Sequence, residues 1–174
     1  GVDKILLKKL NLLKVKSPRL NDWKRVVDAK LNPKKKVSIA VVGKYVDLKD
    51  SYKSLNEALD HAGIVNLAKV EIHMIDAVKI TRGNVAKVLK PYQAVLVPGG
   101  FGSRGIEGMI YSCQYARENK LPYFGICLGM QIAIIEFSRN VLKLKNANST
   151  EFNSKTKYPV IGLVTEWKDA SGRI

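Results

Sequence analysis

A cysteine stands between two glycines at the point where a predicted strand meets a predicted helix. Residues 125–129 read GICLG, after the apolar run 122–126 and at the start of the helix-like run 128–137. The pattern G-x-C-x-G matches the nucleophile elbow G-x-S-x-G, with sulfur in place of oxygen. Gly125 and Gly129 would let the strand turn abruptly, and the helix N-terminus behind Cys127 favours the thiolate. The sequence therefore predicts a nucleophile; the alternative is a small buried cysteine at an ordinary turn.

A second glycine-rich stretch follows the preceding predicted strand. Residues 98–102 read PGGFG, and glycines at a strand end leave backbone N–H groups open to a ligand. Such groups suit an oxyanion hole, to which the amide of Leu128 could also donate. Gly100, Gly102 and Gly105 also fit the dinucleotide pattern G-x-G-x-x-G. That interpretation is disfavoured, because the stretch follows the third strand and no acidic residue ends the next one.

The remaining candidate residues have structural interpretations. Cys113 lies on an apolar helix face and is expected in the core. His61 is expected on the surface at a helix end, and His73 is expected to be structural within a strand. Neither histidine is placed to serve Cys127 as a base. The sequence shows no cluster with metal-ligand spacing, so no metal is expected.

Alternating strands and helices must position these residues. Apolar runs predict five strands, at 37–43, 69–76, 93–100, 122–126 and 158–167. Helical patterns lie between them, at 50–63 (capped by Asp50 or Ser51 and stopped by Gly63), 81–92, 106–119 and 128–137. We therefore expect an α/β fold, a mostly parallel, doubly wound sheet with helices on both faces. Its ligands should bind at the carboxyl ends of the strands.

The chain divides into an extension and a domain. Residues 1–36 carry two short amphipathic helical patterns, the second capped by Asn21 and ended by Pro33, and read as a linker or helical extension. Residues 37–174 form the α/β domain. The extension contains twelve Lys or Arg and three Asp. It therefore carries much of the net charge of +15. A solvated lysine-rich surface is the preferred interpretation, and nucleic-acid binding through residues 1–36 is a less favoured alternative.

Composition narrows the class of protein. The chain has 174 residues, of which 46% are hydrophobic, so a globular domain is expected. No apolar run reaches the roughly 18 residues of a membrane span. Two cysteines make no disulfide framework, and a reduced, cytoplasmic protein is expected. The chain begins with Gly and ends on DASGRI, so we expect it to be a piece of a longer protein.

The two glycine-rich strand ends, in this order, resemble those of the class I (triad) glutamine amidotransferases. Within that family the stretches VPGGFGSRGIEGMI, ARENKLPYFGICLGMQIAIIEF, NANSTEF and YPVIGLVTEW are similar to the glutaminase domains of CTP synthases. The resemblance covers nearly all of residues 37–174, and residues 1–36 resemble the linker to the synthetase half more loosely.

The resemblance implies roles for particular residues. Cys127 would attack the side-chain amide of L-glutamine and form a thioester, with release of ammonia. The oxyanion hole would comprise backbone amides of Leu128 and of Gly99 or Gly100. Three further residues would bind glutamine, namely Phe101, Gln131 and Glu151. A carboxylate at Glu151 suits the α-ammonium of the substrate. The stretch from Arg104 through Glu107 to Gly108 would belong to a loop that responds to GTP, the family's activator.

The resemblance also implies parts that this sequence lacks. The family's triad histidine and glutamate, from an HPE-type motif, have no counterpart, since no histidine follows His73. No cofactor is expected in this domain. The synthetase half, where the family binds ATP and Mg²⁺ and aminates UTP, is absent, and the full-length family assembles as tetramers. We therefore expect weak or absent glutaminase activity from this chain. The alternative is a catalytically silent α/β module with an inert cysteine.

Overall fold

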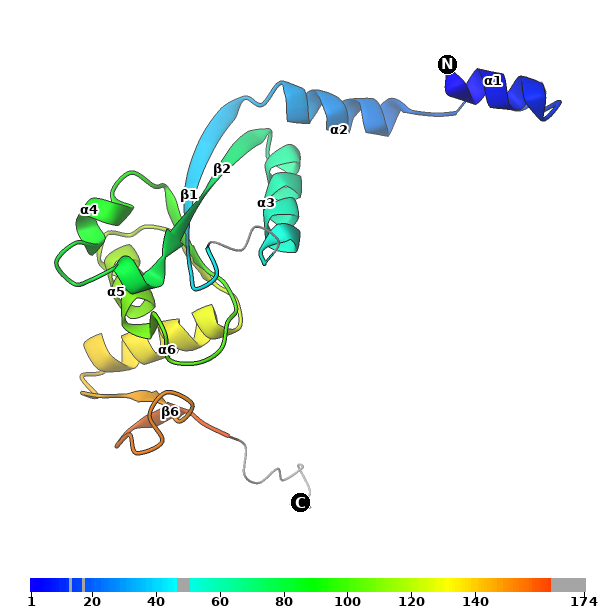
Figure 1. Ribbon diagram of the computed structural model, residues 1–174. Helices are drawn as coiled ribbons and strands as arrows, with labels where there is room; N and C mark the ends of the chain where they lie inside the picture. The colour runs from blue at the N-terminus through cyan, green and yellow to red at the C-terminus, as the bar shows by residue number, and fades with distance from the viewer. Residues whose placement is uncertain (13, 17, 47–50, 164–174) are drawn as a thin grey trace, which may run out of the picture.

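A four-stranded parallel sheet forms the centre of the molecule (Figure 1). The computed structural model describes residues 1–12, 14–16, 18–46 and 51–163. The strands stand in the order β2-β1-β3-β4. Their bounds are Lys35–Gly43 (β1), Ala68–Asp76 (β2), Ala94–Val97 (β3) and Tyr123–Gly125 (β4). Because the chain moves outward from β1 to β2 and then returns to β3 and β4, the sheet is doubly wound.

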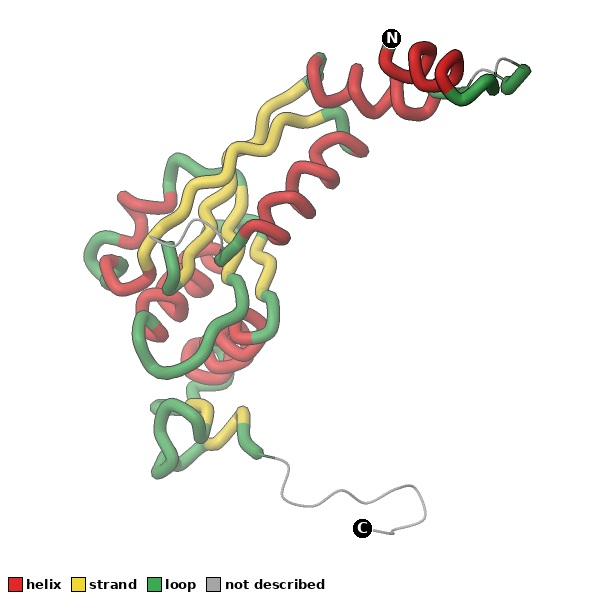
Figure 2. The backbone as a smooth tube through the Cα atoms, turned by 45° about the vertical axis from the view of Figure 1, so that its right-hand side comes forward, coloured by secondary structure: helices red, strands yellow, loops and turns green. Residues whose placement is uncertain are grey.

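Helices cover both faces of this sheet, as the sequence predicts (Figure 2). Helix α3 (Lys53–Val65) packs on β2 and lies on one side. Helix α5 (Ile106–Glu118) packs on β1, β3 and β4 on the other side, with α4 (Val85–Leu89) and a short 3-10 turn, η1 (Ala77–Lys79), against it. Helix α6 (Leu128–Asn140) packs on α5 and β4. The predicted α/β fold is confirmed.

The hydrophobic core lies between the sheet and helices α5 and α6. Ala40, Val41 and Val42 of β1 have no exposed surface, because both faces of the strand are covered at this point. Ala40 and Val42 join the cluster against α5, and Val41 points to the other face by strand alternation. The predicted apolar face of the helix at 106–119 is buried, as its four members show: Ile106, Met109, Ile110 and Cys113.

An ion pair between the buried carboxylate of Glu136 and the exposed Arg117 side chain joins α5 to α6. The Glu136 side chain is 2% exposed, and its carboxylate accepts two bonds from Arg117 Nε and one from Nη2 at 2.7–3.1 Å. Asn140 Nδ2 donates to the same carboxylate at 3.0 Å. Bidentate geometry and a third donor offset the cost of removing this carboxylate from water. The pair therefore fixes the angle at which α6, which begins at the elbow, crosses α5.

The predicted fifth strand does not join the main sheet. Strand β6 (Pro159–Ile161) pairs with β5 (Asn148–Ser149) in a separate two-stranded sheet. The returning chain is fastened to the end of α6, since Leu144 N donates to Ser138 O at 3.0 Å and Arg139 Nε donates to Ala147 O at 2.6 Å. These bonds hold residues 148–149 close to the segment 159–161, which pairs with them rather than with the main sheet. Residues 164–167 of the predicted strand lie outside the described part of the chain.

Three predicted helix boundaries are wrong. The N-cap of α2 (Asn21–Leu31) is Leu20, so Asn21 is the first helical residue. Tyr52 rather than Ser51 caps α3, and Asp50 lies outside the described residues. Gly63 does not stop α3, which continues to Val65. A Cβ at position 63 would lie 2.5 Å from the Ala68 carbonyl oxygen, so this glycine serves the close approach of the helix to β2.

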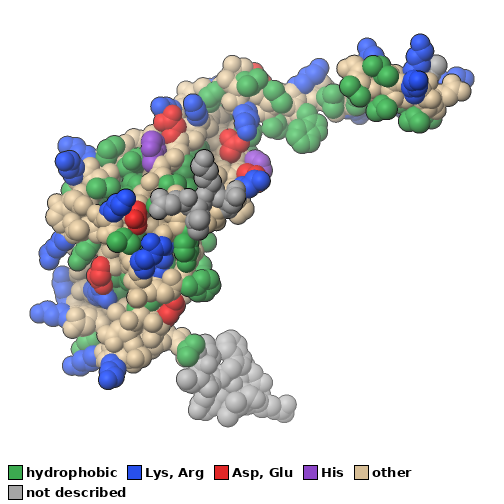
Figure 3. All heavy atoms as spheres, in the orientation of Figure 1, with side chains coloured by type: hydrophobic (Ala, Val, Ile, Leu, Met, Phe, Trp, Pro, Cys, Tyr) green, Lys and Arg blue, Asp and Glu red, His purple; other side chains and the backbone are tan. Residues whose placement is uncertain are grey.

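The N-terminal helices extend away from the sheet (Figure 1). Neither α1 (Val2–Lys9) nor α2 contains a buried residue. Lys30 of α2 forms an ion pair with Asp60 of α3 at 2.6 Å. Lys and Arg side chains are spread over the visible face, from α1 to the opposite end of the described chain (Figure 3). Among the described residues, no helix combines the length and the apolar character needed to cross a bilayer.

The ion pair yields the first prediction. Replacing Arg117 with Ala removes the bidentate partner of the buried Glu136 carboxylate, so we expect the free energy of unfolding to fall by about 2 kcal/mol, less than for a fully buried pair because Arg117 is exposed and its loss admits water. Urea denaturation followed by circular dichroism measures this. Lys120→Ala, at an exposed position in the turn after α5, is the control and should change stability little. Equal stability of the Arg117 variant and the control would contradict a structural role for the pair.

Candidate active site

The two glycine-rich segments meet at one end of the sheet. Strands β3 and β4 are parallel neighbours, with Val97 paired to Gly125, so their carboxyl ends open on the same edge. A Cβ built on Gly99 would lie 3.7 Å from the Cys127 Cβ. The predicted juxtaposition of the PGG turn and the cysteine corner is therefore present.

Cys127 adopts a backbone conformation that side chains rarely tolerate. Its φ is +52° and its ψ is −102°, and it is the N-cap residue of α6. Such a conformation costs about 1–3 kcal/mol and persists only where the surroundings enforce it. The residue is exposed. A strained, accessible cysteine at the start of a helix is the geometry of a nucleophile elbow.

Close backbone packing around the corner enforces this conformation. A Cβ on Gly125 would lie 2.4 Å from the Gly129 backbone, and one on Gly129 would lie 2.1 Å from the Val97 carbonyl oxygen. Both distances are far below contact, so only glycine fits at either position. The Ile126 N–H donates to the same Val97 carbonyl at 2.9 Å, which ties the corner to β3.

Tyr123, which the sequence did not single out, holds the first turn of α6. Its hydroxyl donates to the Gly129 carbonyl at 2.8 Å. Burial raises the pKa of Tyr123, so the hydroxyl stays protonated and remains a donor at neutral pH. This bond links β4 to the helix across the cysteine corner.

Lys44 is a second residue that sequence reasoning missed. It follows β1 at the point where the strand order reverses, and its side chain is buried. Its Nζ donates to the Phe101 carbonyl at 2.9 Å and also to the Gly102 carbonyl. Burial lowers the pKa of Lys44, and the nearby Glu151 carboxylate opposes that shift. A lysine directly after a central strand was the available signal, because that position faces the ligand edge of such sheets.

Two of the predicted glutamine-binding residues line one pocket. Gln131 and Glu151 lie in a cavity of about 540 Å³ with Ser149, Thr150, Ser154, Ile161, Gly162 and Leu163. The Gln131 N–H donates to the Cys127 carbonyl at 3.2 Å, so Gln131 lies one helical turn after Cys127, which does not itself line the pocket. Glu151 Oε1 accepts from the Gly102 N–H at 2.9 Å. This bond joins the pocket to the glycine-rich turn.

The other predicted site residues lie outside this pocket. The Phe101 side chain is 80% exposed and is not among the lining residues. Arg104 donates to the Lys44 carbonyl and lies over the Tyr45 ring. Glu107 pairs with Arg139 at 2.9 Å. Gly108 is buried in α5, where a Cβ would lie 1.9 Å from the Ala77 carbonyl oxygen, so it permits close packing of the helix.

The second cysteine, Cys113, and the two histidines are not part of the site around Cys127. Burial raises the pKa of the Cys113 thiol to about 12, so it stays protonated at neutral pH. His61 is exposed on α3. His73 is exposed on β2, with its ring 5.1 Å from that of Tyr92. Strand β2 is the opposite edge of the sheet from β4, so neither imidazole can act on Cys127.

The chain belongs to the class I glutamine amidotransferase family. The family model "Glutamine amidotransferase class-I" matches residues 47–166, more than half of the chain. The match includes the cysteine corner, the PGG turn and the Gln131–Glu151 pocket. The fold and the strained cysteine fit the expectation from the sequence.

Within the family, the chain is similar to the glutaminase domain of a CTP synthase. The solved structure of the Trypanosoma brucei domain with bound acivicin matches with a TM-score of 0.71 and 37% sequence identity. The match covers 78% of this chain and 53% of that one, so this chain spans about half the length of the trypanosome domain. A Listeria monocytogenes protein named for peptidase E matches at 14% identity over 74% and 63% of the two chains, with a TM-score of 0.33.

The packing at the corner yields a prediction about glycines. Gly129→Ala places a methyl group against the Val97 carbonyl, so we expect a loss of about 2 kcal/mol or more in unfolding free energy. Gly99→Ala is the matched control, because its methyl group would make only an ordinary 3.7 Å contact. Thermal denaturation compares the two variants. Similar melting temperatures would mean that the corner is loosely packed.

Lys44 yields a prediction that separates positioning from stability. Lys44→Met keeps the aliphatic stem but removes both bonds to the glycine-rich turn, so the turn should lose its fixed place beside Cys127. We expect alkylation of Cys127 by a glutamine-mimicking electrophile to slow on the order of tenfold, since small misplacements are costly. Alkylation by iodoacetamide, which needs no pocket, should change little and serves as the control. An equal effect on both reagents would contradict the positioning role.

Proposed function

We propose that this chain is the nucleophile-bearing part of a glutamine-hydrolysing domain that supplies ammonia for the amination of UTP to CTP. The observation that carries the proposal is the strained, exposed Cys127 at the start of α6, with the Gly99 backbone beside it. The similarity to the trypanosome CTP synthase domain supports the choice of substrate and product.

The chemistry begins at sulfur. The Cys127 thiolate attacks the side-chain carbonyl carbon of L-glutamine, and the carbonyl oxygen becomes an oxyanion. The N–H of Leu128, together with that of Gly99 or Gly100, donates to this oxyanion. The tetrahedral intermediate collapses with protonation of the nitrogen, which leaves as ammonia, and a γ-glutamyl thioester remains. Water then hydrolyses the thioester to glutamate and regenerates the thiol.

In this proposal, glutamine binds in the pocket that is lined by Gln131 and Glu151. Glu151 has a second carboxylate oxygen for the α-ammonium group of the substrate, while Oε1 holds the Gly102 N–H. Gln131, from the first turns of α6, offers an amide to the α-carboxylate. Phe101 would have to swing from its exposed position to cover the substrate.

Neither histidine of the sequence is placed to act as the general base of the proposed reaction. Acyl transfer needs a base to deliver the thiolate and to activate water, and neither histidine of the sequence lies near Cys127. In the proposed parent enzyme the ammonia acceptor is a synthetase domain that uses ATP and Mg²⁺, with GTP acting on the stretch Arg104–Gly108 and with tetrameric assembly. By itself, this chain is therefore expected to turn over glutamine slowly or not at all.

A second candidate is a catalytically silent α/β module. The specific observation in its favour is the position of both histidines, on α3 and at the far edge of the sheet. In that case Cys127 would react like any exposed thiol and glutamine would have no effect on it.

Covalent labelling separates the two candidates. We expect the diazoketone analogue of glutamine, diazo-oxonorleucine, to alkylate Cys127 and to spare Cys113, whose thiol is buried and protonated. Excess glutamine should slow the reaction. Peptide mass spectrometry locates the adduct, and Glu151→Gln, which should weaken glutamine protection, is the matched variant. If both cysteines were labelled slowly, and if glutamine did not change the labelling rate, the silent module would be favoured.

A further inference from the structure

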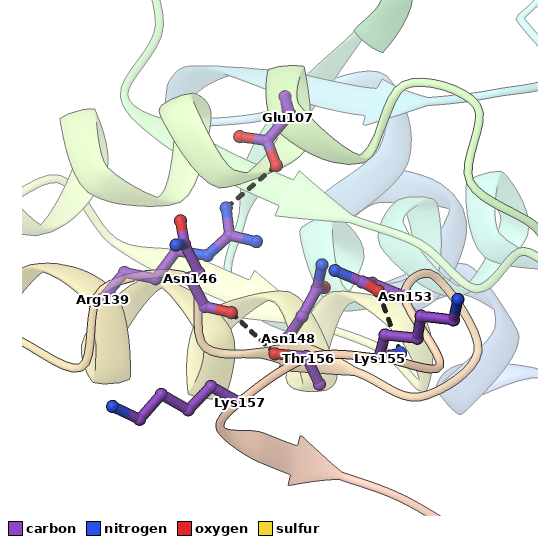
Figure 4. Close-up of a pocket in the computed structure, with 8 residues that line it drawn as sticks. All are labelled: Glu107, Arg139, Asn146, Asn148, Asn153, Lys155, Thr156 and Lys157. Carbon is purple, nitrogen blue, oxygen red and sulfur yellow. Dashed lines mark hydrogen bonds and ion pairs between the residues drawn. The ribbon is translucent and has the colours of Figure 1, made fainter.

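A polar pocket lies at the C-terminal end of α6, the opposite end of this helix from Cys127 (Figure 4). Its volume is about 490 Å³. The lining comes from the start of α5, the end of α6 and the segment 146–157, and consists of Glu107, Arg139, Asn146, Asn148, Asn153, Lys155, Thr156 and Lys157. Three cationic side chains stand against a single carboxylate, so the pocket favours an anion.

Arg139 is held ready for a ligand. Its Nη1 donates to Glu107 at 2.9 Å and its Nε donates to the Ala147 carbonyl at 2.6 Å. Its side chain is 18% exposed. A guanidinium has five N–H donors, so this arrangement fixes the plane of the group and leaves Nη2 for a further acceptor. Such a fixed fork suits an oxyanion, and little entropy is lost when the ligand binds.

The asparagines present donors rather than acceptors. Asn148 Oδ1 accepts from the Ser149 N–H, and Asn153 Oδ1 accepts from the Lys155 N–H, each at 3.0 Å. With both oxygens engaged by the backbone, the NH₂ end of each amide is the end available to a ligand. Thr156 Oγ1 donates to the Asn146 carbonyl at 2.8 Å, which closes the segment into a loop. The polar ends offered by the lining are therefore mostly N–H groups.

We propose that this pocket binds a compact phosphate-class anion. The lining contains no aromatic or aliphatic side chain among the described residues, so nothing there would stack on a nucleoside base. Lys155 and Lys157 extend from the loop in different directions in Figure 4 and stand at the rim. Their long side chains can fold inward over an anion held by Arg139 and the asparagine amides. Inorganic phosphate and the phosphate end of a larger ligand share this chemistry.

The same segment also borders the predicted glutamine pocket. Asn148 and Asn153 line the anion pocket, while Ser149, Glu151 and Ser154 line the other. An anion that ties the loop to Arg139 would hold Glu151 in place through the chain between them. The anion site stands on its own geometry, but its effect on glutamine binding rests on the proposed function.

Nuclear magnetic resonance titration of the full chain tests the site. Inorganic phosphate and tripolyphosphate are the probes, with sodium chloride at matched ionic strength as the reference. We expect saturable shifts of the side-chain amide signals of Asn146, Asn148 and Asn153. Lys155→Gln combined with Lys157→Gln should weaken binding by about tenfold, the order expected for two solvent-exposed ion pairs. Lys87→Gln combined with Lys90→Gln removes the same charge from the exposed end of α4 and should leave affinity unchanged.

The outcomes are distinct. Shifts that never saturate, or equal weakening in both double variants, would overturn the site in favour of diffuse attraction to a basic surface. Binding of tripolyphosphate alone would support a larger phosphorylated ligand, and binding of both would support free phosphate. Glutamine protection of Cys127 should strengthen at least twofold with saturating phosphate; no change would overturn the coupling. Failure of labelling itself would count against the proposed function and leave the anion site intact.

Discussion

The close approach of three backbone segments at the cysteine corner is the constraint on which the site depends. Val97 ends β3, Gly125 ends β4 and Gly129 lies in the first turn of α6, and these segments touch with no space for a Cβ. Only in that packing does Cys127 take φ of +52° at the head of a helix. The strained conformation of Cys127 therefore depends on the register of β3 against β4 and on the angle of α6. Both of these are set by the packing of the core.

Interactions outside the motifs maintain this geometry. The Arg117–Glu136 pair joins α5 to α6, the helix that begins after Cys127, and Tyr123 joins β4 to the first turn of α6. Lys44, which follows β1, donates to the carbonyls of Phe101 and Gly102 in the glycine-rich stretch 98–102, and Glu151 accepts from the Gly102 N–H. The segments around the cysteine corner are therefore linked by polar contacts, partly buried except for the exposed Gly102–Glu151 bond, which fix direction as well as distance.

Sequence reasoning succeeded where a feature is local in the chain. The strand-to-helix corner at Cys127, the apolar face of α5 and the alternation of strands and helices all follow from periodicity and from glycine spacing. Lys44 and Tyr123 were missed because their roles depend on partners in other strands, which no local pattern specifies. The pairing of β6 with β5 was missed for a similar reason, since the competition between two possible partner strands is decided by contacts at the end of α6.

The two halves of a cysteine–histidine mechanism place different demands on a fold. In the proposed mechanism the nucleophile is an accessible sulfur at a helix N-terminus, and contacts among residues 97–129 hold Cys127 in a strained conformation at the start of α6. The base needs only to reach the sulfur from one side, so it can be contributed by a segment distant in the chain or by another polypeptide. In the described part of the chain, both histidines lie away from Cys127, on α3 and on β2, and the strained conformation is present. The conformation of Cys127 therefore follows from the packing of the sheet against α6, and in the proposed reaction a base would contribute proton transfer rather than the shape of the corner.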